Sequence, residues 1–220
     1  MVSLRSAQQQ LRKRRNIVEE ALEDFVQEKM ASTQAPAMTL AREVLLAGGK
    51  RYRPVLTMLA FESAGGEEIS EVMDLALAAE LIHTATLVHD DVVDESNFRR
   101  GFFSINALWK NKIAVLIGDF LLSRGLLLAV KNKEFNLLEI MSEAVQDMSE
   151  GELLQIEKAR KLDIEESVYF DIIRKKTAVL ISSCCACGAS SMNQSEEIIK
   201  KLYLFGEKVG IAFQIKDDLF

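Results

Sequence analysis

The chain has 220 residues, of which 49% are hydrophobic and 27% are charged. This composition can bury a large core, which excludes global disorder. The 27 Lys and Arg against 33 Asp and Glu give a net charge of −6. The chain lacks the long basic run that would indicate a nucleic-acid-binding surface. With 11 glycines and 2 prolines the chain has few turn formers, which favours an all-α fold, here expected as one domain over residues 1–220.

Apolar residues recur at helical spacing along most of the chain. Pro36 and Pro54 stand where helices can begin, since proline is tolerated in a first helical turn. No segment has the strict alternation of a strand, so we predict about eight helices and no sheet. Asp163 and Ser195 are predicted as N-caps. The helices are expected within residues 1–30 and at 36–46, 54–64, 69–93, 113–130, 134–159, 165–188 and 195–220, with a loop marked by Gly101.

The run 113–130 is apolar and long enough to raise the question of whether it spans a membrane. It contains Asp119 and Arg124, each of which costs roughly 2.5–3.5 kcal/mol at a bilayer centre. We therefore interpret it as a buried core helix and expect no membrane span. The N-terminus has no apolar segment typical of a secretory signal. We expect a soluble cytoplasmic protein.

Two kinds of small residue lie inside the predicted helices. The odd, clustered cysteines make a poor disulfide framework and indicate a reducing compartment, where they would be small core residues. They are Cys184, Cys185 and Cys187. The glycines are each about 1 kcal/mol less favourable than alanine, so we expect either close helix packing or a nearby ligand. They are Gly118, Gly125, Gly151, Gly206 and Gly210.

The sharpest motif is the acidic run that ends the helix predicted at 69–93. On a helix Asp90 and Asp94 share a face, and Asp91 stands about 100° round. Such like charges repel one another, which a bound cation would relieve. Hard oxygen ligands suit Mg²⁺, which keeps waters and bridges to phosphates; the alternative is a solvated acidic helix end. Asp217 and Asp218 form a second pair, as a Mg²⁺ cluster held from two walls would need.

Three basic clusters complement these carboxylates. The segment GGKRYRP at 48–54 places three cations in a glycine turn that opens a helix, where backbone N–H groups and the helix dipole favour anions. Arg99 and Arg100 follow the first aspartates, and Lys175 and Lys176 precede Thr177. Arginine binds phosphate in a bidentate manner, although each cluster alone could be surface charge. Together with the apolar interior, they suit diphosphate substrates with apolar tails.

The chain resembles the trans-isoprenyl diphosphate synthases, or polyprenyl synthetases, in six segments that occur in the family's order. These are GGKRYRP (48–54), LIHTATLVHDDVVDES (81–96), RRG (99–101), GDFLLSR (118–124), KT (176–177) and FQIKDD (213–218). The resemblance implies an all-α isoprenoid-synthase bundle around a central cavity, usually a homodimer. It also implies a prenyltransferase that joins isopentenyl diphosphate to an allylic diphosphate in head-to-tail steps.

The resemblance also implies roles for residues that match the motifs. Mg²⁺, in up to three ions, would be held by Asp90, Asp91, Asp94, Asp217 and Asp218. The allylic substrate would be held by Arg99, Lys176, Thr177 and Gln214, and isopentenyl diphosphate by Lys50, Arg53, His83 and Arg100. His83 could instead be an ordinary core histidine. The catalytic set would be Asp90, Asp91, Asp94, Arg99, Lys176 and Asp217.

The residues five and four positions before the first aspartate bear on product length. In the family these positions wall the growing tail, and here they are the small Ala85 and Thr86. Only Val92 and Val93 separate the aspartates, without the insertion of many short-chain members. The motif most resembles the long-chain, octaprenyl- or solanesyl-type synthases that make quinone tails. A farnesyl or geranylgeranyl diphosphate synthase remains the alternative, and small-residue packing is the other explanation for Ala85.

Three further alternatives remain from the sequence. A class I terpene cyclase shares the fold but should lack the GGKRYRP and RRG segments. A non-catalytic subunit of a heteromeric synthase typically loses aspartates, whereas this chain keeps the first motif whole. A ligand-free helical scaffold would not need arginines and aspartates so near one another. The family's second motif continues past Asp218 to a third aspartate, so we expect the chain to be C-terminally truncated.

Overall fold

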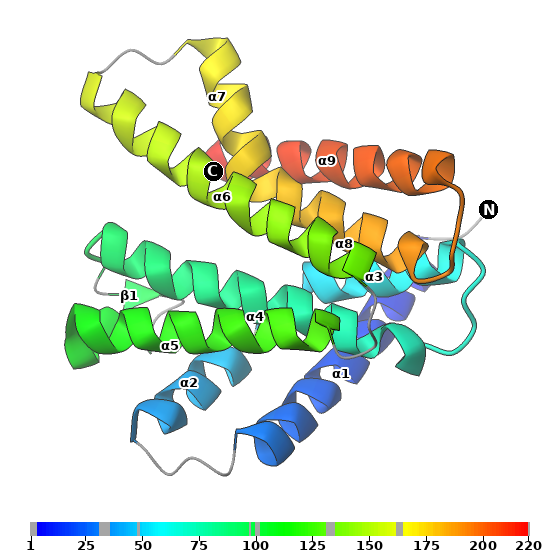
Figure 1. Cartoon of the computed structure of the whole chain (residues 1–220), viewed down its shortest axis with the longest axis horizontal. Coiled ribbons are helices and arrows are strands. Elements are labelled where there is room, and N and C mark those ends of the chain that lie inside the picture. Colours follow the sequence, from blue (N-terminus) through cyan, green and yellow to red (C-terminus); the bar gives the residue numbers. More distant parts are fainter. Residues whose placement is uncertain are drawn as a thin grey trace. The chain divides into compact units, whose positions relative to one another are not determined.

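The structure is a computed structural model that describes residues 4–30, 36–47, 49–96, 98–99, 102–130, 135–161 and 165–219. Of residues 29, 36–37, 98–99, 102–103, 106, 108–110 and 161 it describes the backbone alone. The described residues are overwhelmingly helical, which confirms the all-α prediction (Figure 1). They group into two compact units, Met1–Val55 with Leu77–Leu128, and Leu56–Ala76 with Ala129–Phe220. A single domain over residues 1–220 stays a prediction.

The first unit contains the helices α1 (Leu4–Lys29), α2 (Pro36–Leu46) and most of α5 (Ile105–Val130). It also takes the start of α3 (Tyr52–Ser63) and the longer part of α4 (Ser70–Val93). Its core is built from fully buried aliphatic side chains such as Leu22, Leu81 and Leu121. The Arg124 guanidinium of α5 lies 5.7 Å from the centre of the Phe25 ring of α1, a cation–π contact.

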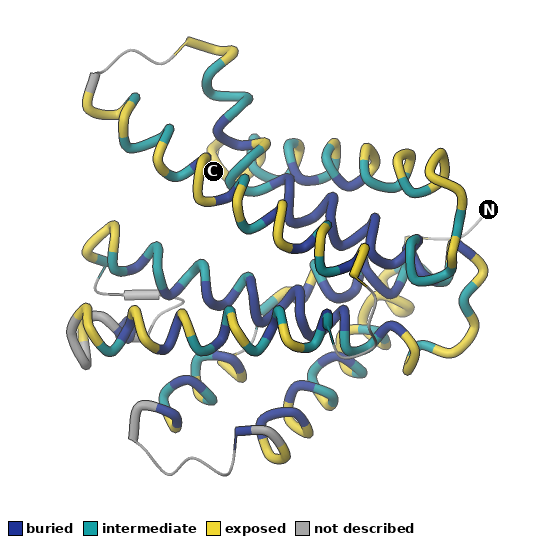
Figure 2. Tube along the Cα trace, in the orientation of Figure 1, coloured by how far each residue is buried: buried dark blue, intermediate teal, exposed yellow. Residues whose placement is uncertain are grey.

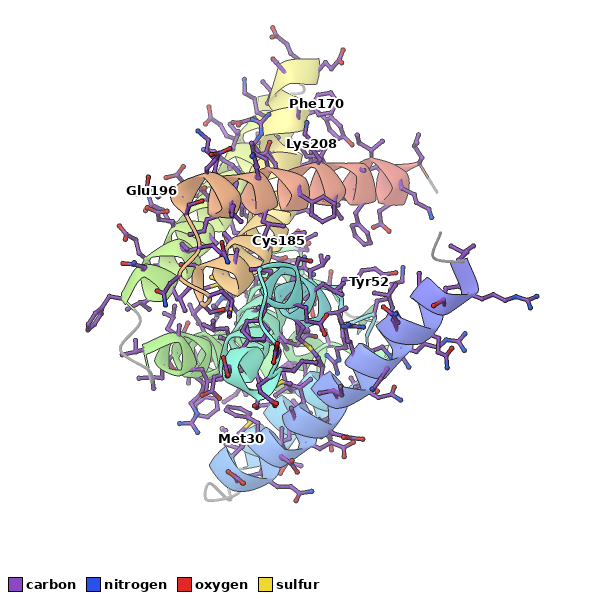
Figure 3. All side chains as sticks on the ribbon, turned by 90° about the vertical axis from the view of Figure 1, so that its right-hand side faces the viewer. Met30, Tyr52, Phe170, Cys185, Glu196 and Lys208 are labelled. Atoms are coloured by element: carbon purple, nitrogen blue, oxygen red, sulfur yellow. The ribbon has the colours of Figure 1, made fainter. Side chains whose placement is uncertain are left out.

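The second unit is organised around α8 (Val179–Ser190), whose residues from Val179 to Ala189 are all buried. It packs against α6 (Phe135–Lys161) and α9 (Glu196–Asp218) (Figures 1 and 2). Between α7 (Glu166–Ile173) and α8 the chain forms a short π-helix, η1 (Arg174–Ala178). Cys185, labelled in Figure 3, belongs to the buried part of α8, as expected for a small core residue.

Close helix packing explains the five helical glycines that the sequence analysis named. A Cβ added at any of them would lie 2.9 Å or less from an atom of a neighbouring helix. On α5, for example, the Cβ at Gly118 would lie 2.2 Å from the His89 ring of α4. The alternative explanation, a ligand beside these glycines, is not needed.

The helix bounds follow the predictions closely, and the differences are as follows. Residues 98–99 and 102–103 form a two-residue hairpin, β1 (Phe98–Arg99) with β2 (Phe102–Phe103), although no strand was expected. The π-helix η1 interrupts the helix expected at 165–188. α5 begins at Ile105, well before the expected residue 113, because the Ser104 hydroxyl accepts the Ala107 N–H at 3.1 Å and caps it. Ser195 occupies its N-cap position but makes no capping hydrogen bond, and Asp163 lies outside the described residues.

A further correction concerns the burial of the apolar run in α5. By length and composition alone, two of the described helices could cross a membrane, Ser70–Val93 and Asn111–Val130. The first is 67% buried in the structure, as a core helix should be, but the second is only 33% buried. The interpretation of this run as a buried core helix is therefore wrong for most of its surface.

Candidate active site

The first aspartate motif is the C-terminal end of α4. The Glu95 N–H donates to the Val92 carbonyl at 3.4 Å and the Ser96 N–H donates to the Asp91 carbonyl at 2.9 Å. This pair of bonds is a Schellman motif, which requires a left-handed residue, and Glu95 has φ 51°. The motif stops the helix directly after the aspartates. Asp91 is buried, Asp90 is half-buried and Asp94 is exposed.

Both acidic pairs stand at the unfavourable end of a helix. The C-terminus of a helix carries a partial negative charge, which favours cations and disfavours carboxylates. Asp90 is in the last turn of α4, which contains no basic residue, and Asp94 directly follows this helix. Asp217 and Asp218 end α9, whose last turn also contains Lys216. A bound cation would remove this conflict.

The carboxylates fit a cation that is shared with a substrate. Within the described part of the chain, no three His, Cys, Asp or Glu side chains lie close enough together to hold a metal ion by themselves. Mg²⁺, however, usually binds one or two carboxylates and completes its shell with waters and substrate phosphates. Asp90 and Asp94, four residues apart on one face, meet that requirement.

Gly118 explains why α5 can approach this motif. His89, directly before the aspartates, lies against α5 with its Nε2 3.3 Å from Oδ1 of Asp119. The same nitrogen is 3.3 Å from the carbonyl oxygen of Val115. Any side chain at position 118 would collide with this ring. The start of the GDFLLSR segment therefore packs beside the first aspartate motif.

The basic turn divides its three cations between solvent and core. Lys50 is exposed, with its Nζ 5.7 Å from the centre of the Tyr52 ring, and Arg53 is half-buried. Arg51 points inward: its side chain is 2% exposed and its Nη1 donates to Oε1 of Glu80 at 2.5 Å. Its φ of 51° is left-handed, which costs a non-glycine residue roughly 1–2 kcal/mol. The sequence analysis counted Arg51 among the three cations of an anion-binding turn, which is wrong for this residue because it is buried against Glu80. It did not single out Glu80.

The second unit joins several predicted residues in one chain of hydrogen bonds. The Thr177 hydroxyl donates to Oε1 of Gln214 at 2.8 Å, and Nε2 of Gln214 donates to Oδ1 of Asp218 at 2.7 Å. The Tyr169 hydroxyl donates to the other oxygen of Asp218, also at 2.7 Å, and this bond raises the pKa of Tyr169. Asp218 is thereby held through both oxygens. Tyr169 was missed because a single tyrosine in an amphipathic helix carries no distinct signal.

The π-helix η1 carries the KT segment. Its extra residue per turn is visible in the bond from the Val179 N–H to the Arg174 carbonyl, five residues back. Such π-bulges occur frequently at functional sites. In this structure Lys176 pairs with Glu152 at 2.5 Å and donates to Gln155 at 3.3 Å, so a diphosphate would have to replace these partners.

The structure places other predicted residues without testing their roles. Ala85 is completely buried, and the half-buried Thr86 donates its hydroxyl hydrogen bond to the His83 carbonyl at 2.8 Å. Arg100 and the side chain of Arg99 lie outside the described residues. The first acidic motif belongs to the first unit and the second motif to the other, so a site shared by both remains a prediction.

The second unit also contains a pocket of about 370 Å³ between α6, α8 and α9. Its lining is mainly apolar but includes charged residues such as Glu143, Asp147 and Lys200. Among the residues predicted to bind substrate or metal, none of those whose side chains the structure describes lines this pocket.

These features agree with a comparison of the sequence against known families. The profile described as Polyprenyl synthetase matches residues 34–220. The chain belongs to the polyprenyl synthetase family. The resemblance inferred from the six segments is thereby confirmed.

Named relatives and a solved structure agree with this assignment. The chain is 40% identical over 199 residues to the all-trans-nonaprenyl-diphosphate synthase (geranyl-diphosphate specific) of Rhodobacter capsulatus, covering 90% of this chain and 61% of that protein. It is 39% identical over 202 residues to heptaprenyl diphosphate synthase component 2 of Geobacillus stearothermophilus, covering 92% and 62%. The crystal structure of a decaprenyl diphosphate synthase from Rhodobacter capsulatus superposes with TM-score 0.89 at 39% identity, covering 96% of this chain and 65% of that one. The chain thus spans about three fifths of the relatives' length.

Proposed function

We propose that the protein is a trans-polyprenyl diphosphate synthase, a prenyltransferase that condenses isopentenyl diphosphate with an allylic diphosphate. The observation that carries this proposal is the aspartate motif of α4, which places carboxylates at the negative end of a helix, where a bound cation is favourable. Family membership and the names of the relatives point in the same direction. A terpene cyclase would not need the basic turn that precedes α3.

In the proposed mechanism, the chain positions two diphosphates and stabilises departing charge. Asp90, Asp91 and Asp94, with Asp217 and Asp218, would hold Mg²⁺, which supplies positive charge to the allylic diphosphate as its C–O bond breaks. Arg99, Lys176, Thr177 and Gln214 would bind that diphosphate. Lys50, Arg53, His83 and Arg100 would orient isopentenyl diphosphate, whose double bond attacks the allylic carbon. The released diphosphate takes the final proton, so no dedicated protein nucleophile is required.

The first test is the product formed from isopentenyl diphosphate, farnesyl diphosphate and Mg²⁺, measured by mass spectrometry. We expect a Mg²⁺-dependent ladder of polyprenyl diphosphates, absent in Asp90→Ala. The matched control is Asp24→Ala on the exposed face of α1, which should leave the ladder unchanged. A ladder of equal yield from Asp90→Ala and the wild type would refute the assigned role.

The product is proposed to be a long-chain polyprenyl diphosphate suited to quinone side chains. Small residues at positions 85 and 86 and the long-chain names of the relatives support this choice. The ladder itself decides the alternative: a product that stops at farnesyl or geranylgeranyl length would make this a short-chain synthase. Thr86→Phe should shorten a long product, because an aromatic ring at a half-buried position would block the growing tail.

We propose that the enzyme is a soluble cytoplasmic homodimer whose subunits meet along α5. This helix exposes Leu116 at 63% and Leu127 at 59%, which is unusual for a helix of such hydropathy. The alternative is a heteromeric synthase, suggested by the relative named as a component 2. Leu116→Glu should convert a dimer to a monomer in sedimentation equilibrium. A wild-type chain that is monomeric, and active only with a second protein, would favour the heteromeric assembly.

A further inference from the structure

The three cations of the basic turn face in different directions. Lys50 is exposed and Arg53 is half-buried, whereas Arg51 between them is 4% exposed. A left-handed backbone at Arg51 produces this reversal. The turn thus holds its middle cation inside, while its outer cations are fully or partly accessible to solvent.

The Arg51 side chain connects three helices of the first unit. Its Nη1 donates to Oε1 of Glu80 in α4 at 2.5 Å, and its Nη2 donates at 2.9 Å to the Leu45 carbonyl in the last turn of α2. That carbonyl has no partner within its own helix, so the guanidinium caps α2. The Arg51 carbonyl accepts the Val55 N–H at 3.2 Å, which starts α3.

Glu80 lies one turn before His83 on the same side of α4, since residues three apart are neighbours on a helix. The Arg51–Glu80 contact thus joins the turn that carries Lys50 and Arg53 to the helix that carries His83. In the proposed function, these three residues bind isopentenyl diphosphate. They come from two separate elements, and one buried contact sets their spacing.

A purely structural role explains this contact poorly. Both side chains are almost completely buried, at 2% and 4% exposure. Burying two charges removes them from water, and well-packed apolar residues of similar volume are often as stable or more stable. The charged pair has one property that apolar residues lack, because the planar guanidinium fixes direction through two hydrogen bonds at once.

We propose that Arg51 and Glu80 are positioning residues for the isopentenyl diphosphate subsite. They touch no substrate themselves but hold the basic turn at a fixed distance and angle from α4. This inference rests on the proposed function. Lysine at position 51 would keep the charge but cannot bond the Glu80 carboxylate and the Leu45 carbonyl in one plane, because its ammonium lacks the fork.

The test compares the affinities for the two substrates separately. Isothermal titration calorimetry would measure the dissociation constant of isopentenyl diphosphate alone and that of farnesyl diphosphate with Mg²⁺. The variants are Arg51→Lys and the apolar double substitution Arg51→Met with Glu80→Met, and circular dichroism would follow their Tm. Arg15→Lys is the matched control, since it makes the same change in an exposed ion pair with Glu19 on α1.

We expect both variants to weaken isopentenyl diphosphate binding about tenfold and to change farnesyl diphosphate binding less than twofold, with no effect of Arg15→Lys. A double variant that folds and binds isopentenyl diphosphate like the wild type would overturn the inference and leave the proposed function intact. Equal weakening for both substrates with a lower Tm would also overturn it, because that is the pattern of a purely structural contact. A wild-type chain that binds no isopentenyl diphosphate would overturn the proposed function and this inference together.

Discussion

Adding a single methyl group at Gly210 should push α9 away from η1, the two elements that carry Gln214 and Thr177 of the candidate site. Gly210 lies on α9, directly over the π-helix η1. A Cβ built there would lie 2.5 Å from Cα and 2.7 Å from Cβ of Ala178. Because the nearest atom belongs to the backbone, no side-chain rotation can relieve the contact.

The structure gives the size and sign of the effect of Gly210→Ala. Carbon atoms pack best at roughly 3.5–4.0 Å, so α9 would have to move by about 1 Å. Overpacking of this kind costs about 1–3 kcal/mol, and the rigid backbone favours the upper end. Alanine regains about 1 kcal/mol of helix propensity. We therefore expect a net loss of about 2 kcal/mol, which lowers the Tm of a chain of this size by about 4–8 °C.

The same displacement should reach the substrate-binding residues. Gln214 follows one turn later on α9, and its bond to the Thr177 hydroxyl measures 2.8 Å. A shift of about 1 Å would break this bond. Farnesyl diphosphate binding should weaken severalfold in calorimetry, alongside the lower Tm measured by differential scanning calorimetry.

The control uses the opposite substitution two residues further along α9. Ala212 is exposed, so Ala212→Gly should lose only the helix propensity of about 1 kcal/mol. Propensity alone predicts that Gly210→Ala raises the Tm by a comparable amount. A raised Tm for Gly210→Ala would therefore refute the packing argument.

Two further predictions concern single side chains of the second unit. Tyr169→Phe removes one of the two donors to the Asp218 carboxylate, so Mg²⁺-dependent binding of inorganic diphosphate should weaken severalfold at unchanged Tm. The control Tyr203→Phe should leave this binding unchanged. Wild-type affinity in Tyr169→Phe would show that Tyr169 is dispensable. Burial raises the pKa of Cys185 to about 12, so at pH 8 its thiolate fraction is about a thousandfold below that of a cysteine with the ordinary value of 9. Alkylation mapped by mass spectrometry should therefore reach Cys185 only after unfolding, and fast labelling of the native protein would contradict its burial.

The sequence predicted most helices because their signals are local. Proline at position 36 starts α2 as expected, and the unbroken apolar run ending at Val93 gives α4 almost to the residue. The hairpin at 98–103 escaped because two-residue strands are too short to show a period. The π-helix escaped because one extra residue in a turn leaves no mark in composition.

The direction of side chains was harder to predict than the presence of helices. Lys50, Arg51 and Arg53 look equivalent in the sequence, but a partner about thirty residues away turns Arg51 inward. Glu80 did carry a readable signal, since a lone acid inside the apolar run ALAAELI must find a partner when it is buried. For α5, composition gave the apolar character correctly but could not show which part of its surface the fold covers.

The aspartate motif at the end of α4 is better explained by function than by stability. A helix selected for stability would end in lysine or arginine, yet α4 ends in acids and in a left-handed Glu95. Asp94→Asn should therefore raise the Tm of the ligand-free protein by about 2 °C, because it removes charge from the helix terminus and from beside Asp90. With Mg²⁺ and inorganic diphosphate added, the wild type should have the higher Tm, because only the wild type keeps the full set of carboxylates. A ligand-free Asp94→Asn that is less stable than the wild type would mean that the carboxylate already has a structural partner, and the argument for a cation at this helix end would fail.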